Sequence, residues 1–404
     1  METSVPYRSL LRVAGVGFFP LGFLARLPYA SAALATLLLL QSSTHSYAFA
    51  GLASATLSSA TAVGGPLLGT LADRHGHRRV GVVAALANIA AWAGLLAASH
   101  GARAGMLAAA GLVGLTQPQV GPLVRVYWSR LIHRHGEHRL LPAALSYEAA
   151  ADELSFVAGP ALVGVLATVT PYAPATAAML LLTTTTLPFA LRPTDGTTAR
   201  PAAGAGERSL PYRPLAVLFL AMAAMGAVFG AVQTAVTVYA DAIGETGAAG
   251  LVYAEFGIGS ALAGAACAWL PRRFSLRARY VTFAGALFVG MLLLFAGARV
   301  MPLPAAVPVA SVTVAPYMIT LYALTERLAP AERAATAMTV LCAGGPLGTA
   351  AGQAVSGALA EPYGTEGPLL VALTAATGAL ALALAVTARK KRRAEAASPA
   401  PAEK

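Results

Sequence analysis

The sequence predicts an all-α integral membrane protein with twelve transmembrane helices arranged as two six-helix halves. Three observations support this fold class. Hydrophobic residues make up 57% of the 404 residues and charged residues only 11%, whereas about a quarter of the residues of a soluble domain are charged. The apolar residues occur in segments of about 20 residues, the length that crosses a bilayer as a helix, and they cover nearly all faces of each predicted helix. The positively charged residues lie almost entirely in alternate loops.

Twelve apolar segments separated by polar loops are the expected membrane spans. In order, they are residues 14–40, 46–72, 79–99, 104–128, 142–168, 171–191, 214–241, 247–270, 279–300, 302–325, 334–359 and 366–388. The one long break, residues 192–213, is rich in Pro, Gly, Thr and charged residues, as flexible linkers are. The sequence thus predicts a first half at 1–191, a cytosolic linker at 192–213, a second half at 214–388 and a basic cytosolic tail at 389–404.

The loops that contain Arg and Lys indicate the orientation, because these residues concentrate in cytoplasmic loops. Only Arg103 and Arg299 fall in loops on one side, and Arg26 and Arg125 fall within spans. All other Arg and Lys residues lie on the opposite side, so we expect both termini in the cytosol. Arginine far outnumbers lysine and alanine is abundant, which is typical of GC-rich bacterial genomes. We therefore expect a bacterial cytoplasmic (inner) membrane protein.

The net charge of +11 does not indicate a nucleic-acid-binding protein, because the basic residues are dispersed over loops rather than gathered on a base-reading helix. Histidine relays within the membrane and buried metal sites are not expected, since every histidine falls in a loop: His45, His75, His77, His100, His133, His135 and His138. No phosphate-binding glycine loop and no nucleophile with a nearby base is recognisable. We expect no enzyme activity and no cofactor, with a proton gradient as the energy source. The expected partners are a small-molecule substrate and the lipid bilayer, and the protein is expected to be a monomer.

A charged turn between the second and third spans carries the clearest motif. It has the pattern G-x-x-x-D-R-x-G-x-R-R, formed by Gly69, Asp73, Arg74, Gly76, Arg78 and Arg79. On this pattern the chain resembles the major facilitator superfamily (MFS) of transporters. The resemblance implies two halves with a substrate cavity between them. It also implies that this loop is a conformational latch. The two halves resemble each other in sequence, since the segment VAGPALVG in the fifth span corresponds in position to GGPLGTAAG in the eleventh span.

Gly159 and Pro160 in the fifth span resemble the Gly-Pro motif of the family's drug/proton antiporters. The next glycine, Gly164, stands one position later than in that motif. Arg125 also follows, rather than precedes, the TQPQVG segment of the fourth span. The proton relay of the antiporter motif therefore does not transfer to this chain.

Ionisable residues inside the spans are candidates for proton or substrate binding, because a charge costs several kcal/mol at this depth. Arg26 lies roughly 18 Å into the first span, and Pro28 should loosen the helix beside it. We expect Arg26 to contact the substrate or to be the counter-ion of a proton site. The alternative is a pair with a carboxylate that only fixes helix packing.

The fifth span contains three carboxylates. Glu148 and Asp152 are one turn apart and share a face, while Glu153 points about 100° away. Burial and mutual repulsion should favour protonation of at least one of them. Arg125, near the cytosolic end of the fourth span, is a candidate partner for Glu148 or Asp152. We expect Asp152 or Glu153 to carry the coupling proton, with Glu148 and Arg125 as a gate pair. A purely structural ion-pair network is the alternative.

The second half has one acid within a span, Glu255, which we expect to bind a cationic substrate or a proton. Five neutral residues are candidates for the cavity wall: Gln117, Gln119, Gln233, Thr234 and Thr237. Each could instead form an ordinary hydrogen bond between helices.

These features predict a secondary active transporter that exports a small amphipathic or drug-like compound by proton-coupled alternating access. The few polar residues within the spans favour such a cargo over a sugar, which would need many hydrogen-bonding partners. One alternative is proton-coupled transport of a polar metabolite, such as a sugar or an amino-acid-like compound. The other is a membrane enzyme or receptor that uses this scaffold without transport.

Overall fold

The computed structural model describes residues 5–118, 120–121, 124, 127–128, 131–132, 140–192, 211–245, 247–267, 270–271, 273–329 and 334–396. Within these residues the chain is almost entirely helical and contains no strand. The fold is therefore all-α, as the sequence predicts.

The helices of the first half of the chain follow the predicted spans. They are α1 (Val5–Ala14), α2 (Phe18–Leu24), α3 (Leu27–Thr44), α4 (Tyr47–His75), α5 (His77–Ala98), α6 (Arg103–Leu115), α8 (Leu141–Ala167), α9 (Ala173–Leu181), the π-helical turn η2 (Leu182–Thr186) and α10 (Leu187–Leu191). Three differences from the prediction stand out. α1 precedes the first predicted span, that span is divided between α2 and α3, and the sixth span contains the π-helical turn.

The second half shows the same agreement. Its helices are α11 (Tyr212–Ala242), α12 (Ala248–Ala266), α13 (Leu276–Gly297), α14 (Leu303–Ser311), α15 (Val314–Leu328), α16 (Ala334–Tyr363) and α17 (Glu366–Ala396). The predicted span 302–325 is broken between α14 and α15. Pro316 explains the break, because it has no N–H to donate to the carbonyl of Val312.

Among the described residues, seven helical stretches are long and apolar enough to cross a membrane. Shorter apolar helices occur at Arg103–Leu115, Leu154–Ala167 and Ala248–Gly264. α4 and α16 contain 29 and 30 residues, which is long enough to cross, but they are richer in Gly, Ser and Thr. Within the described residues, the predicted spans thus coincide with helices or runs of helices, except that the span 104–128 leaves the helical conformation after Leu115.

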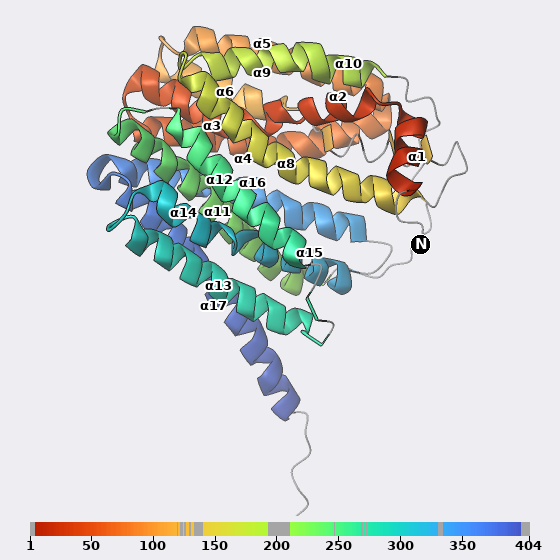
Figure 1. The fold of residues 1–404 in the computed structure, drawn as a ribbon, viewed down its shortest axis with the longest axis vertical. Coiled ribbons are helices and arrows are strands. Elements are labelled where there is room, and N and C mark those ends of the chain that lie inside the picture. Colours follow the sequence, from red (N-terminus) through yellow and green to blue (C-terminus); the bar gives the residue numbers. More distant parts are fainter. Residues whose placement is uncertain are drawn as a thin grey trace, which may run out of the picture.

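Figure 1 shows the helices of the first half, coloured red to yellow, above those of the second half, coloured green to blue. The most extensive contacts between them are those of α4 with α16 and of α8 with α12. Glycines permit both approaches. A Cβ on Gly51 of α4 would lie 2.5 Å from the carbonyl oxygen of Gln353 on α16, and a Cβ on Gly164 of α8 would lie 2.5 Å from the carbonyl oxygen of Gly247. Small residues at such contacts let membrane helices pack closely.

The bundle has two ends, which we name by one residue each. The His45 end contains the turns that follow α3, α11 and α16, and the helix ends beside these turns are joined by hydrogen bonds from Tyr47 to Asp241 and from Ser46 to Glu361. The Gly76 end contains the turn between α4 and α5. Gly76 has a φ of 92°, a conformation that glycine adopts readily. The predicted glycine turn between the second and third spans is thereby confirmed.

Candidate functional site

The first predicted span is not one continuous helix, because the helix is interrupted at Ala25 and Arg26. α2 ends at Leu24 and α3 begins at Leu27, with Arg26 as the N-cap residue of α3. Pro28 has no N–H to donate to Leu24, so α-helical hydrogen bonding cannot run through this point. The N–H of Arg26 instead donates to the carbonyl of Phe23, three residues back, at 3.0 Å. The sequence predicted a loosened helix beside Pro28, and the structure confirms it.

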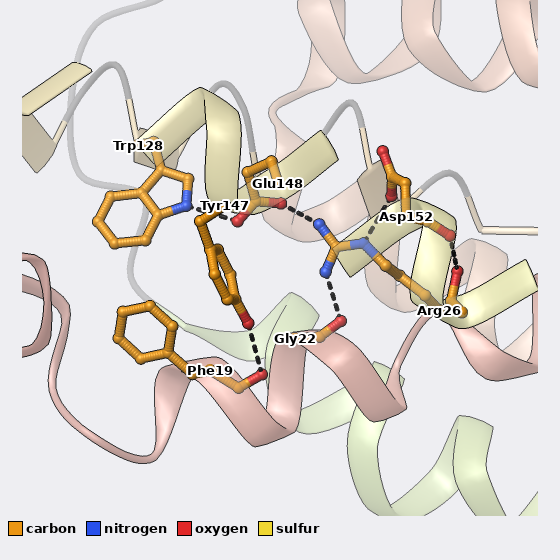
Figure 2. A network of polar contacts seen from close by, with 8 residues as sticks. Phe19, Gly22, Arg26, Trp128, Tyr147, Glu148 and Asp152 are labelled. Atoms are coloured by element: carbon orange, nitrogen blue, oxygen red, sulfur yellow. Dashed lines mark hydrogen bonds and ion pairs between the residues drawn. The ribbon is translucent and has the colours of Figure 1, made fainter. Parts of the chain in front are cut away.

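The side chain of Arg26 is buried at this break and binds two carboxylates of α8 (Figure 2). Its Nη2 pairs with Oε2 of Glu148, and its Nε donates to Oδ1 of Asp152 at 2.7 Å. Its Nη1 donates to the carbonyl oxygen of Gly22 at 2.6 Å. Since Glu148 and Asp152 are one helical turn apart on α8, a single guanidinium group reaches both.

The two carboxylates have different surroundings. The side chain of Glu148 is 0% exposed, and its second oxygen accepts a hydrogen bond from Nε1 of Trp128 at 2.6 Å. The side chain of Asp152 is 28% exposed. Gly121 leaves room for it, since a Cβ at Gly121 would lie 3.3 Å from Oδ1 of Asp152. The side chain of Glu148 is therefore fixed and fully buried, whereas the side chain of Asp152 is partly exposed.

Aromatic side chains surround the buried end of this network (Figure 2). The rings of Phe18 and Trp128 pack edge to face with centroids 5.0 Å apart, and Phe19 packs against Tyr147 at 4.8 Å. The hydroxyl of Tyr147 donates to the carbonyl oxygen of Phe19 at 3.4 Å. Such apolar packing strengthens an ion pair but makes the loss of either partner costly.

Replacing Trp128 with Phe should lower the free energy of unfolding by about 1.5–3 kcal/mol beyond the effect of the smaller ring. The reason is that Glu148 would lose a hydrogen bond to a charged group. Trp92 provides a matched control, because it is equally buried and its Nε1 has no hydrogen-bond partner among the described residues. Thermal unfolding of Trp128→Phe and Trp92→Phe in detergent measures the difference. Equal losses in the two variants would contradict a bonding role for Trp128.

Asp152 shares its face of α8 with Phe156, one turn further along, whose side chain is 49% exposed. The ring of Phe156 packs edge-on against Tyr29 of α3 with centroids 6.2 Å apart. Tyr29 is also close enough to Asp152 and to Cys342 of α16 to interact electrostatically with both. The accessible carboxylate thus lies beside exposed aromatic surface, and this region approaches α16 from the other half of the chain.

Several predicted site residues lie outside the described part of the molecule: Arg125, Gln119 and the side chain of Glu153. The structure does supply a partner for Glu148 and Asp152 that the sequence analysis did not assign, namely Arg26. These contacts join residues 122 and 126 positions apart. No spacing pattern within the sequence could have identified them.

Gln117 supports the break in the first span. Its Nε2 donates to the carbonyl oxygen of Pro28 at 3.3 Å, and its Oε1 accepts from Thr61 of α4 at 3.2 Å. Gly159 of α8 packs on the same region, since a Cβ there would lie 2.9 Å from Cβ of Ala30. Pro160 is buried next to it. Gln117 therefore positions the backbone of Pro28, two residues after Arg26.

Gln233 belongs to a second buried network, which the sequence analysis found only in part. Nε2 of Gln353 on α16 donates to Oε1 of Gln233 on α11 at 2.6 Å, and Ser58 of α4 donates to Oε1 of Gln353 at 3.1 Å. Thr234 and Thr237 are buried but donate to carbonyls of their own helix. Gln353 was missed, although a glutamine within an apolar, glycine-rich span is a candidate for a hydrogen bond between helices.

Glu255 is not brought to the Arg26 site. It lies on the face of α12 that also carries the exposed side chains of Leu251, Ile258 and Leu262. Among the described residues it has no hydrogen-bond or ion-pair partner. No group of three or more His, Cys, Asp or Glu side chains in the described part of the chain is placed to hold a metal ion.

The charged motif forms the turn at the Gly76 end. Gly69 has open space around its Cα, and the side chains of Arg74, Arg78 and Arg79 are exposed. The side chain of Asp73 lies outside the described part of the structure. A latch function for this turn stays a prediction.

Comparison with known proteins finds one matching family model, Major Facilitator Superfamily, over residues 18–341. No curated protein sequence matches. Among solved structures, the nucleoside transporter NupG aligns at 18% identity over 92% of this chain and 97% of its own, with a TM-score of 0.70. A bacterial homologue of the iron transporter ferroportin, in an inward-facing state, aligns at 16% identity over 93% and 98%, with a TM-score of 0.67. The human organic anion transporter MFSD10 aligns at 17% identity over 94% and 99%, with a TM-score of 0.64. At these identities the structures establish a shared fold.

Proposed function

The chain belongs to the major facilitator superfamily and is a transporter rather than an enzyme, and we propose that it exports a small amphipathic or drug-like compound in exchange for protons. The two halves work by alternating access, with the proton gradient as the energy source. In this proposal a monomer lies in a bacterial inner membrane, and its termini and Gly76 end face the cytosol. The placement of Arg and Lys in the loops at that end supports this orientation.

The observation that carries the proposal is the contact of Arg26 with both Glu148 and Asp152 inside the membrane bundle. Charged groups in a membrane interior are expensive and mark ion or substrate pathways. A network needed only for packing could use one carboxylate for one arginine. This one holds a second carboxylate, Asp152, on the accessible side.

The arrangement explains how a proton can be bound and released without disrupting the fold. When Asp152 takes up a proton, Arg26 keeps Glu148 as its counter-ion, so no buried charge is left uncompensated. When Asp152 releases the proton, its carboxylate regains the bond from Nε of Arg26. Glu148 therefore holds Arg26 in position, and Asp152 carries the coupling proton.

The surroundings of Asp152 favour an amphipathic cargo. Phe156 and Tyr29 offer aromatic surface directly beside the carboxylate, and aromatic rings bind apolar and cationic groups alike. A compound with an apolar body and one polar or charged group would fit these neighbours. Binding of its polar or charged group next to Asp152 would favour the ionised carboxylate and so release the proton, as exchange of cargo for protons requires.

A second candidate function, proton-coupled transport of a polar metabolite, is favoured by the buried chain of Ser58, Gln353 and Gln233. Amide and hydroxyl groups at the contact between α4 and α16 could exchange their mutual bonds for bonds to a polar cargo. One of the solved structures with this fold is a nucleoside transporter. The two candidates therefore differ in which network contacts the cargo.

Reconstitution separates the candidates. Purified protein is placed in liposomes that contain a pH-sensitive dye, and amphipathic amines, nucleosides and sugars are added in turn. We expect amphipathic compounds to drive a saturable proton flux in the opposite direction, and the polar compounds to drive none. Proton flux driven only by the polar compounds would favour the second candidate. A cargo flux whose rate is independent of the pH gradient would contradict proton coupling altogether.

A further inference from the structure

Hydrogen bonds between the two halves of the chain close the His45 end. The hydroxyl of Tyr47 donates to Oδ2 of Asp241 at 2.6 Å, and Nε2 of Gln41 lies 3.4 Å from the same oxygen. The hydroxyl of Ser46 donates to Oε1 of Glu361 at 2.5 Å, and the N–H of Ala48 donates to it at 3.3 Å. The described contacts thus join the start of α4 to the last turns of α11 and α16.

The contacts divide by chemistry. The donors all come from the first half of the chain, and the acceptors are two carboxylates of the second half. Glu361 meets the first turn of α4, where the N–H of Ala48 has no partner within the helix and the helix dipole favours a negative charge. Neither carboxylate has a second-half donor in the described contacts at this site. Separation of the two halves would therefore remove the hydrogen-bond donors of both carboxylates.

Backbone packing adds to these contacts. One turn beyond Tyr47, Gly51 of α4 meets Gly357 of α16, and a Cβ on Gly51 would lie 3.0 Å from Cα of Gly357. This approach leaves no room for a side chain between the two helices. The donors and acceptors at the helix ends are consequently held within bonding distance only while this glycine contact is closed.

We propose that Asp241 and Glu361 are gating residues, which together with Tyr47 and Ser46 hold the His45 end closed until the two halves separate there. The proposal rests on alternating access, because a gate has a function only if this end opens during transport. It assigns no role to Asp152 and names no cargo. It can therefore hold or fail independently of proton coupling at the Arg26 site.

The gate should also respond to acid. The bonds from Ser46 and Ala48 lower the pKa of Glu361 below its usual value of 4.5, so the closed form favours the ionised carboxylate. The contribution of Glu361 to the stability of the closed form is then complete at pH values above its usual pKa. It is lost as the pH falls through the lowered pKa of the closed form. Its charged neighbour in the described contacts is Arg103. Arg103 lowers the pKa of Glu361 further and lies 5.3 Å from the ring centroid of Phe49.

Distance measurements between spin labels at the His45 end test the gate. Val169 is next to Thr168, which lies against Gly247 after α11, and Val300 is next to Arg299, which pairs with Glu366 after α16. Both therefore lie at this end, in different halves. They are 77% and 80% exposed and accept labels as cysteines after Cys267 and Cys342 are replaced by alanine. We expect two populations of molecules, one with a longer and one with a shorter label distance. Tyr47→Phe and Glu361→Gln should each raise the ratio of the long-distance to the short-distance population about tenfold at pH 7, the effect of one lost bond to a charged group. The parent protein should show this rise only below about pH 4.5, where carboxylates begin to be protonated.

Tyr172→Phe is the matched control. Its hydroxyl also forms a hydrogen bond near the His45 end, to Nε2 of His100 at 3.0 Å, but both residues belong to the first half. Its loss should leave the label distances unchanged. The proposal is overturned if Tyr47→Phe and Glu361→Gln leave the distances unchanged, or if Tyr172→Phe changes them equally. The measurement needs neither cargo nor a pH gradient, so failure of the proposed transport function would not imitate either outcome.

Discussion

Replacing Arg26 with Gln is expected to lower the free energy of unfolding by about 3–5 kcal/mol. Glu148 would be left as a buried charge without its counter-ion, which is one of the most destabilising single changes in a protein interior. Thermal or denaturant unfolding in detergent measures the loss. Transport should fail as well, since Asp152 would lose the donor that positions its carboxylate.

Two companion variants make this prediction specific. Removing both charges with Arg26→Gln and Glu148→Gln should recover part of the lost stability, because a neutral pair avoids the uncompensated charge. Arg299→Gln breaks the exposed pair between Arg299 and Glu366, and it should change stability little, because solvent screens exposed pairs. Equal losses in Arg26→Gln and Arg299→Gln would contradict a buried, energetically important network.

Replacing Asp152 with Asn should abolish transport driven by a pH gradient while leaving the protein folded and able to bind its cargo. The amide keeps the size of the side chain but cannot take up and release a proton near neutral pH. Because Glu148 still neutralises Arg26, we expect only a small loss of stability. Uptake into liposomes with and without an imposed pH gradient measures the effect, and the variant should show the same slow rate in both.

Glu255→Gln is the control for this prediction. Both residues are carboxylates within helices, but Glu255 lies on the exposed face of α12, away from Arg26. The control should keep its response to the pH gradient. If Glu255→Gln lost the response and Asp152→Asn kept it, the coupling proton would belong to the second half of the chain and the present assignment would be wrong.

The sequence predicted those features that depend on neighbouring residues. The apolar segments predicted the helices because each segment must satisfy its own backbone hydrogen bonds in lipid. Gly76 predicted the turn after α4, and Pro28 predicted the break beside Arg26. The four-residue spacing predicted that Glu148 and Asp152 share a face, which the structure bears out, since both contact one arginine.

Contacts between distant residues could not be predicted in this way. The sequence offered two arginines within spans, and spacing alone could not decide which of them reaches α8. Trp128 and Gln353 were missed because a single tryptophan or glutamine in a span has many possible partners. The bonds at the His45 end join residues 194 and 315 positions apart, so they depend on how the two halves pack rather than on any local pattern.

The most direct test of the account is whether cargo binding releases a proton from Asp152. A transported compound is added to purified protein in weakly buffered detergent solution near neutral pH, and the released protons are measured with a dye. The account predicts release from the parent protein and from Glu255→Gln, and none from Asp152→Asn, although that variant still binds the compound. Release of the same size from Asp152→Asn would show that another group carries the proton and would contradict the account.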